Sequence, residues 1–182
     1  MVSQTLFDLP SKNAAEFSPD RRYRYTLRRQ WDDALPYCLF VMLNPSTADA
    51  THDDPTIRRC SGFAKAWGFG GLHVVNLSPL RATDPKELLA AGRESDAVWD
   101  ENLEHIWYKA QTSNMVIAAW GVHGAAENRD SRVMGELREN VGIVYCLGLT
   151  KDGHPKHPLY LKADTVPAPL TRPYPLPGGK AL

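Results

Sequence analysis

No excess of charge of either sign is present in this sequence, because its 21 Lys and Arg residues balance 21 Asp and Glu residues. Proteins that coat nucleic acid or anionic membranes carry a basic surplus, so the balance counts against both classes. An enzyme with a local basic rim stays compatible with it. The sequence also has no apolar run near the 18 or so residues that a membrane helix needs, and no leader pattern within Met1 to Pro10. We therefore expect a soluble cytoplasmic protein that binds no membrane.

Cysteine is scarce, and the three cysteines stand far apart at Cys38, Cys60 and Cys146. Cys38 and Cys146 fall inside apolar segments, where buried thiols are common. An odd count without any CxxC spacing predicts neither a disulfide framework nor a zinc site. It favours a reducing compartment.

Familiar catalytic signatures are missing as well. Gly68-Phe-Gly-Gly71 lacks the Gly-Lys-Ser/Thr ending of a P-loop, and neither Ser46 nor Ser78 stands in a GxSxG elbow. We expect no cofactor and no bound metal. One loop keeps a metal alternative open, because it carries hard ligands that suit Mg²⁺, namely Asp49, His52, Asp53 and Asp54.

What the sequence does contain is a short apolar run, residues 38–43, that ends abruptly at Asn44-Pro45. Its length suits one strand, and apolar residues on both faces are typical of the centre of a parallel sheet. Further apolar runs at 72–77, 115–120 and 142–147 alternate with segments of helical spacing at 55–67, 85–91, 96–109 and 125–140. The pattern predicts an α/β fold, a three-layer sandwich with a central, mostly parallel four-stranded sheet.

The chain reads as one domain, residues 21–164, between a flexible segment 1–20 and a proline-rich tail 165–182. Residues 23–31 alternate between basic and apolar side chains, which predicts a half-buried strand. A turn at 32–36 separates it from the central strand. We expect the two to form a hairpin whose first strand is an antiparallel edge strand. The oligomeric state is left open.

Polar residues follow each predicted parallel strand. Because parallel strands end at the same edge of a sheet, these loops should converge on one cleft, where such sheets bind ligands. The candidates there have structural alternatives: Asn44 could close an Asx turn, Asp54 reads better as a helix cap than as a catalyst, His157 could be a turn residue, and Trp120 could belong to the core.

Several motifs along residues 22–162 resemble a bacterial and phage family catalogued as domain of unknown function 1643. They include Leu43-Asn-Pro-Ser-Thr-Ala-Asp49, Asp54-Pro-Thr-Ile-Arg-Arg59, Arg81-Ala-Thr-Asp-Pro85 and His157-Pro-Leu-Tyr160. Two motifs, Asn44-Pro45 and His157-Pro158, also resemble the first and last motifs of the uracil-DNA glycosylase superfamily. That second resemblance implies a glycosylase-like fold. The string Gly-Gln-Asp-Pro-Tyr of that superfamily is absent.

The resemblance implies an enzyme that cleaves an N-glycosidic bond of a nucleotide or nucleic acid. We assign catalysis to Asn44, which would hold water, to Asp49 as the carboxylate, and to His157 as a donor to the leaving base. The substrate-binding candidates are Ser46, Asn76, Arg81, Trp120, His123 and Tyr160, and the phosphate-binding candidates are Arg58, Arg59 and Lys156. Two alternatives stay open: a binding module for nucleotides or nucleic acid without catalysis, and a metal-assisted phosphoester hydrolase that uses the acidic loop.

Overall fold

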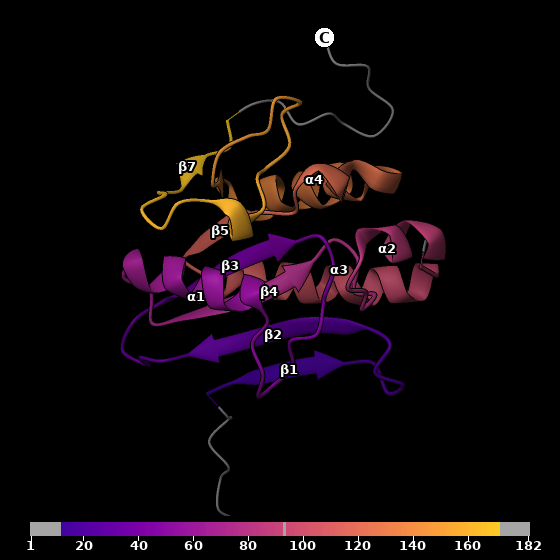
Figure 1. The fold of residues 1–182 in the computed structure, drawn as a ribbon, viewed down its shortest axis with the longest axis horizontal. Coiled ribbons are helices and arrows are strands. Elements are labelled where there is room, and N and C mark those ends of the chain that lie inside the picture. Colours follow the sequence, from indigo (N-terminus) through magenta and orange to yellow (C-terminus); the bar gives the residue numbers. More distant parts are fainter. Residues whose placement is uncertain (1–11, 93, 172–182) are drawn as a thin grey trace, which may run out of the picture.

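A single seven-stranded sheet forms the centre of the molecule (Figure 1). The structure is a computed structural model that describes residues 12–92 and 94–171. The strands are β1 (Ala14–Phe17), β2 (Arg24–Gln30), β3 (Tyr37–Met42), β4 (Gly71–Asn76), β5 (Met115–Ala118), β6 (Val144–Cys146) and β7 (Ala168–Pro169). The helices are α1 (Pro55–Ala66), α2 (Pro85–Ala91), α3 (Asp96–Gln111) and α4 (Arg129–Val141), with 3₁₀ turns η1 (Val122–Asn128) and η2 (Pro158–Tyr160).

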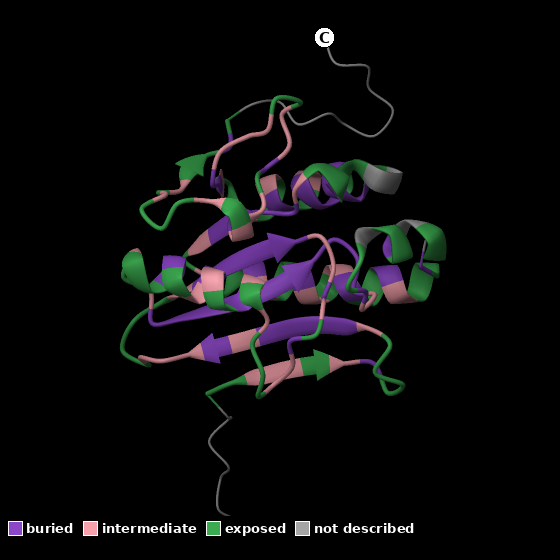
Figure 2. Ribbon diagram, in the orientation of Figure 1, coloured by how far each residue is buried: buried purple, intermediate pink, exposed green. Residues whose placement is uncertain are grey.

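The middle of the sheet is parallel, as the sequence predicts. β3 pairs in parallel with β4 on one side and β5 on the other, and β5 pairs in parallel with β6. β3 is therefore a central strand, and apart from half-buried Tyr37 it is buried (Figure 2). Strand β4 is buried along its whole length.

The sheet is larger than predicted, because antiparallel strands extend it at both sides in the order β1-β2-β4-β3-β5-β6-β7. β1 and β7 lie in segments 1–20 and 165–182, for which the sequence predicted no strand. They have four and two residues, too few for a strand period to be read from the sequence. The outer parts of those segments, residues 1–11 and 172–182, lie outside the described residues.

The predicted hairpin between residues 23–31 and the central strand is wrong. β2 pairs antiparallel with β4, where Leu27 is opposite Val74, and β1 covers the other side of β2, so β2 is not the edge strand. Both sides of β3 are already occupied by parallel neighbours. An alternating pattern shows that a strand is half-buried, but it does not identify the partner strand.

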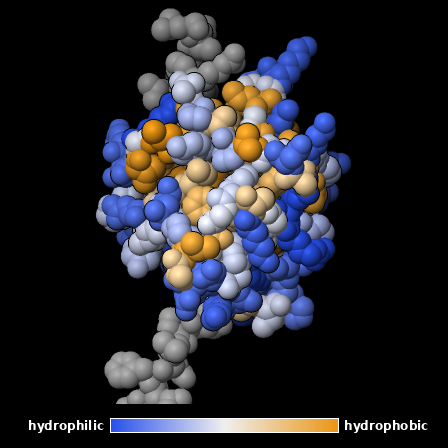
Figure 3. Space-filling model, turned by 90° about the vertical axis from the view of Figure 1, so that its left-hand side faces the viewer, coloured by the Kyte–Doolittle hydropathy of each residue, from blue (hydrophilic) through white to orange (hydrophobic). Residues whose placement is uncertain are grey.

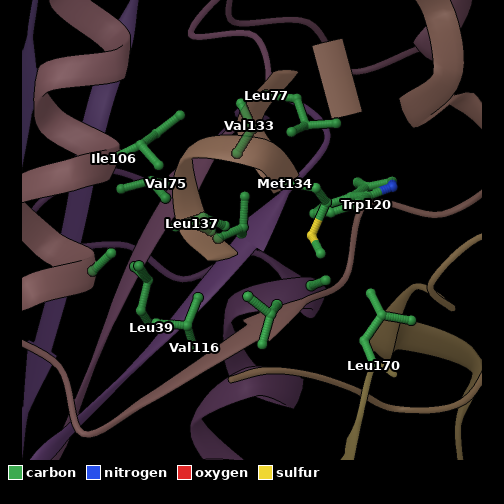
Figure 4. Close-up of a cluster of buried hydrophobic side chains, with 14 of the residues drawn as sticks. Leu39, Val75, Leu77, Ile106, Val116, Trp120, Val133, Met134, Leu137 and Leu170 are labelled. Carbon is green, nitrogen blue, oxygen red and sulfur yellow. The ribbon is translucent and has the colours of Figure 1, made fainter. Parts of the chain in front are cut away.

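Helices cover both faces of the sheet, which gives three layers. On one face, Ile57 and Phe63 of α1 pack against Phe40 and Val74. On the other face lies the cluster in Figure 4, where the sheet contributes Leu39, Val75 and Val116, α3 contributes Ile106, and α4 contributes Val133, Met134 and Leu137. Residues 39 and 40 of β3 are adjacent and therefore point to opposite faces.

Local sequence signals set the helix starts that position the site. Asp54 is the N-cap of α1, because its Oδ1 accepts a hydrogen bond from the backbone N–H of Ile57 at 2.8 Å, and Pro55 follows at the first helical position. Asp84 caps α2 in the same way through the N–H of Lys86.

The outer surface is mixed in character. Seen from the end at which the parallel strands begin, hydrophobic residues form several separate groups among hydrophilic ones (Figure 3). The three cysteines are buried and free. Within residues 12–92 and 94–171, no helix combines the length and apolarity that crossing a bilayer requires.

Candidate functional site

A cavity of about 700 Å³ lies at the carboxyl ends of the parallel strands. The chain runs from β3 to β4 on one side and later returns to place β5 on the other side of β3. Ligands of open α/β sheets bind at such a reversal of strand order. The cavity is lined by residues 42–46 after β3, by Asn76 and residues 82–83 after β4, by residues 120–123 after β5, and by several residues of the segment 150–161 after β6. The predicted convergence of four strand-end loops is confirmed.

Most of the predicted site residues line this cavity. They are Asn44, Ser46, Asn76, Trp120, His123, Lys156, His157 and Tyr160. Four others are not among the lining residues: Asp49, Arg58, Arg59 and Arg81. The structure also adds lining residues that the sequence did not single out as site residues, among them Arg24, Thr56, Thr83 and Thr150, and it places Asp54 in the lining, which the sequence interpreted as a helix cap.

Asn76 is the most unusual polar residue of the cavity. It ends β4, is 1% exposed, and neither Oδ1 nor Nδ2 of its side chain has a hydrogen-bond partner in the described structure. Its backbone is held firmly, because the carbonyl oxygen accepts a hydrogen bond from Asn102 Nδ2 at 3.0 Å. Buried amides almost always have partners, so an unpartnered amide on a residue that lines a cavity marks the place where a ligand would supply the missing bonds.

Asn44 uses half of its amide to build the site. Its Nδ2 donates to the carbonyl oxygens of Ala82 at 2.7 Å and of Pro45 at 3.1 Å, which joins the loops that follow β3 and β4. The sequence left open an Asx turn, in which Oδ1 would accept a backbone N–H, but here Nδ2 donates and joins two loops instead. Oδ1 of Asn44 has no partner in the part of the chain that the structure describes, and it can accept a hydrogen bond from water or ligand.

His157 is set up as a neutral donor. Its Nδ1 accepts a hydrogen bond from the backbone N–H of Leu159 at 3.3 Å, so the proton of the neutral ring is on Nε2. Burial lowers the pKa of His157 below its usual value, while the charge of Asp54 acts weakly in the opposite direction. Because burial is the larger effect, the ring is a neutral imidazole near neutral pH, and its Nε2–H can donate one hydrogen bond.

The sequence assigned the catalytic carboxylate to Asp49 and interpreted Asp54 as a helix cap, but Asp54 lines the cavity and Asp49 does not. Asp49 lies off the cavity, and its Oδ1 accepts from the backbone N–H groups of Thr51 and His52 at 2.8 and 2.9 Å. These bonds lower the pKa of Asp49. Asp54 caps α1 through Oδ1 alone and is the sole carboxylate among the described residues that line the cavity.

Two buried arginines of β2 hold the acidic loop in place. Arg29 Nη2 donates to the carbonyl oxygen of Asp49 at 2.5 Å, and its Nε pairs with Asp53 at 2.7 Å. Arg24 Nη1 donates to the carbonyl oxygen of Ala48 at 2.7 Å. Arg24 also lines the cavity, and burial lowers its pKa to about 10. The sequence showed both arginines only as the basic positions of an alternating strand.

Trp120 forms the wall between core and cavity. It is 1% exposed, packs in the cluster of Figure 4 and lines the cavity, so both roles that the sequence allowed apply. Gly124 makes room for it, because a Cβ at that position would lie 2.0 Å from Trp120 Cδ1. Gly121, at a φ of +77°, bonds through its N–H to the carbonyl of Pro155 and ties this loop to the one with His157.

The predicted phosphate ligands of α1 are engaged elsewhere. Arg59 donates to the carbonyl oxygen of Leu161 and stacks over Phe63, which holds the loop after β6 against α1. Arg58 donates to the carbonyl oxygen of Asp53 at 2.5 Å. Lys156 alone of these three lines the cavity, with an exposed side chain.

The rim carries exposed side chains of different kinds. Tyr160 is 86% exposed and Val122 is 50% exposed, and both line the mouth together with exposed His123. Within the described ranges no group of three His, Cys, Asp or Glu residues is arranged to hold a metal ion. The acidic loop that carried the metal alternative contributes its oxygens to turns, to Arg29 and to the cap of α1.

A family model of proteins of unknown function, DUF1643, matches residues 24–159. The chain belongs to this family. The DUF1643 match covers β2, all the parallel strands and nearly all of the cavity, and it leaves out Tyr160 and Leu161 of the lining. No curated protein and no solved structure matches the chain.

Proposed function

We propose that the cavity binds a nucleobase and that this protein cleaves the N-glycosidic bond of a nucleotide or nucleic acid. The proposal is carried by Asn76, whose carboxamide is buried at the cavity wall with both polar atoms unpartnered. A carboxamide offers one donor and one acceptor side by side. The hydrogen-bonding edge of a nucleobase offers the complementary pair, and a flipped or unpaired base is read through that edge.

The chemistry follows from the groups around Asn76. The bond between the base nitrogen and C1′ of the sugar breaks, and its electron pair leaves with the base. His157 Nε2–H donates to the base oxygen on which this negative charge accumulates, as a neutral imidazole does in an oxyanion site. A neutral imidazole suits this task, because it stabilises the charge by donating a hydrogen bond and keeps its proton.

The sugar side needs a negative charge and a water molecule. We move the carboxylate role from Asp49 to Asp54, because Asp54 lines the cavity and its Oδ2 has no partner among the described residues. Its charge stabilises the oxocarbenium-like sugar. Water held by Asn44 Oδ1 supplies the hydroxyl group that C1′ gains, and the proton of that water ends on the released base.

The resemblance to uracil-DNA glycosylases supports the same reading. Asn44-Pro45 follows the central strand β3 and His157-Pro158 follows the last parallel strand β6. Residues 44 and 157 line one cavity although they are far apart in the sequence.

The test is release of free base. Oligonucleotides that contain uracil or hypoxanthine, and the corresponding free nucleotides, are incubated with the protein and the base is measured by chromatography. We expect release that falls about 10²- to 10⁴-fold in Asn76→Leu and His157→Ala. Asn140→Ala, which changes an exposed asparagine on α4, serves as the control.

Release that persists unchanged in Asn76→Leu and His157→Ala would remove this assignment. Base binding that depends on Asn76 but yields no product would identify the protein as a binding module. Both outcomes are read beside a thermal unfolding curve of each variant, so that loss of fold is not mistaken for loss of function.

A further inference from the structure

Beside the cavity, the hairpin of β1 and β2 gathers three arginines that the site described above does not use. The turn between the strands is built by Ser18, whose carbonyl accepts from the N–H of Arg21 at 2.8 Å and whose Oγ accepts from the N–H of Tyr23 at 3.0 Å. It places Arg21 at a φ of 57°, in the left-handed region that non-glycine residues seldom adopt. Arg21 and Arg22 are both exposed at this turn.

Arg81 joins them from the loop after β4. Its backbone N–H bonds to the carbonyl of Arg22 at 3.1 Å, and its Nη1 donates to the carbonyl of Arg21 at 3.2 Å. The ring of Phe17 lies under two guanidinium groups, with Cζ of Arg21 at 4.1 Å and Cζ of Arg81 at 5.2 Å from its centroid. We call Phe17, Arg21, Arg22 and Arg81 the arginine surface.

The charge of this surface is only partly offset, by the Asp20 carboxylate, which interacts electrostatically with Arg22. None of its three guanidinium groups forms an ion pair with any residue in the described ranges. Asp20 in the turn accepts from Ser18 Oγ and from the backbone N–H of Arg22. Arg81 is also close enough to buried Arg24 that their repulsion contributes to the lowered pKa of Arg24. Positive groups that stack on an aromatic ring and repel one another favour an anionic partner.

The arginine surface is continuous with the cavity. Arg81 is followed directly by Ala82 and Thr83, which line the cavity, and Arg24 lines it from β2. Tyr160, which also lines the cavity, presents an 86% exposed aromatic ring. A chain that places one unit in the cavity can therefore contact guanidinium groups and an exposed aromatic ring.

We propose that the arginine surface binds the phosphate backbone of single-stranded nucleic acid whose unpaired base enters the cavity. The inference rests on the proposed function for what enters the cavity, and it adds that the substrate is a strand and not a free nucleotide. Guanidinium groups bind phosphate oxygens through paired N–H donors, and aromatic rings stack on bases that have left a duplex. A neutral net charge does not oppose this, because the positive charge is local.

The experiment measures binding of a fluorescent single-stranded oligonucleotide by anisotropy as a function of salt. The variant Arg21→Gln/Arg22→Gln/Arg81→Gln is compared with Lys65→Gln/Lys86→Gln/Arg132→Gln, which removes three charges from exposed positions outside the cavity lining. We expect the first variant to bind on the order of tenfold more weakly at low salt and to lower the slope of log K against log salt by about 2. The second should match the unmodified protein.

Four results would overturn the proposal. Two concern the variants: equal slopes for the first variant and the unmodified protein, or an equal loss in the charge-matched control. Two concern the ligand: a free mononucleotide that binds as tightly as the strand, or a duplex that outcompetes the single strand. Failure of the proposed function looks different: the unmodified protein then releases no base, or Asn76→Leu releases it equally well, while the salt slope still depends on the three arginines.

Discussion

The acidic loop 47–54 and the strand ends at the cavity are both rich in polar side chains, but their hydrogen bonds differ. In the loop, the carboxylate of Asp49 accepts from backbone N–H groups, Asp53 pairs with Arg29, and the backbone carbonyls accept from arginines of β2. At the strand ends, Asn76 has no side-chain partner and Asn44 keeps its Oδ1 free. The loop has the more conspicuous polar residues in the sequence, but they are bonded within the protein and stabilise the fold. Asn76 and Asn44 keep unbonded side-chain atoms and line the cavity.

Whether a polar side chain is bonded within the protein separates structural groups from candidate ligand-binding groups in this fold. A polar group that is bonded inside the protein contributes to stability, and a buried one without a partner costs stability. The cost is tolerated where a ligand supplies the missing bonds. Each of the following changes separates the two kinds of polar group.

The largest expected effect comes from the bonded group. Arg29→Leu removes the donor to Asp53 and to the carbonyls of Asp49 and His52, and it should lower the free energy of unfolding by about 4 kcal/mol. Urea unfolding at neutral pH measures this loss. Exposed Arg22→Leu is the control and should change stability by less than about 0.5 kcal/mol. A loss below about 1 kcal/mol for Arg29→Leu would contradict its scaffold role.

The next largest effect is the pH dependence of stability that His73 causes, a residue whose Nδ1 has no partner within the described residues and which does not line the cavity. His73 is buried and stacks on Tyr37 at 4.6 Å, and burial lowers its pKa to about 4. The unfolded chain binds a proton below pH 6.5 and the folded chain does not until about pH 4, so stability falls as pH falls through this window. The loss should reach about 3 kcal/mol.

Two variants identify the histidine behind that loss. His73→Phe should flatten the stability curve between pH 6.5 and 4 and leave base release unchanged, because residue 73 does not line the cavity. His157→Gln should remove a smaller part in the same direction, since burial also lowers the pKa of His157. A curve that keeps its full slope in His73→Phe would exclude this residue as the cause.

The smallest effect concerns Asn76 itself and has the opposite sign to that of Arg29. Asn76→Leu should raise the free energy of unfolding by about 1 kcal/mol, because it removes an unsatisfied amide. Its neighbour Asn102 is fully buried too, but Asn102 Nδ2 donates to the Asn76 carbonyl. Asn102→Leu should therefore lower stability by about 2 kcal/mol. Thermal melts of the pair that shift in the same direction would break the comparison.

Local patterns in the sequence were sufficient for the frame of the site. The run 38–43 is apolar on both faces, so its central place in a parallel sheet followed, and with it the meeting of the loops that carry Asn44, Asn76, Trp120 and His157. The Asp54-Pro55 helix start was also visible. These features depend on neighbours in the sequence or on a general rule about parallel sheets.

Other parts depend on contacts between distant segments. Asp54 was read as a cap, and no local signal reveals that a cap can also line a cavity. Arg24 and Arg29 looked like exposed positions of a strand because the loop that accepts their hydrogen bonds is distant in the sequence. Arg58 and Arg59 looked like phosphate ligands because the carbonyl oxygens they bind belong to other segments.

The pairing of β2 with β4 also dictates an order of assembly. Leu27 can pair with Val74 only after the 47 residues that follow Leu27 in the chain, up to and including Val74, have been synthesised. The segment between them forms β3 and α1. The β3-α1-β4 unit can form by itself as a right-handed crossover, whereas β2 can pair locally with β1 but gains its second ladder only when β4 is in place. The contacts of Arg24 and Arg29 with the acidic loop, and the meeting of Arg21 with Arg81, therefore arise late. Protection of the β2 amides that bond to β4 should lag behind that of the β3 amides in pulsed hydrogen exchange.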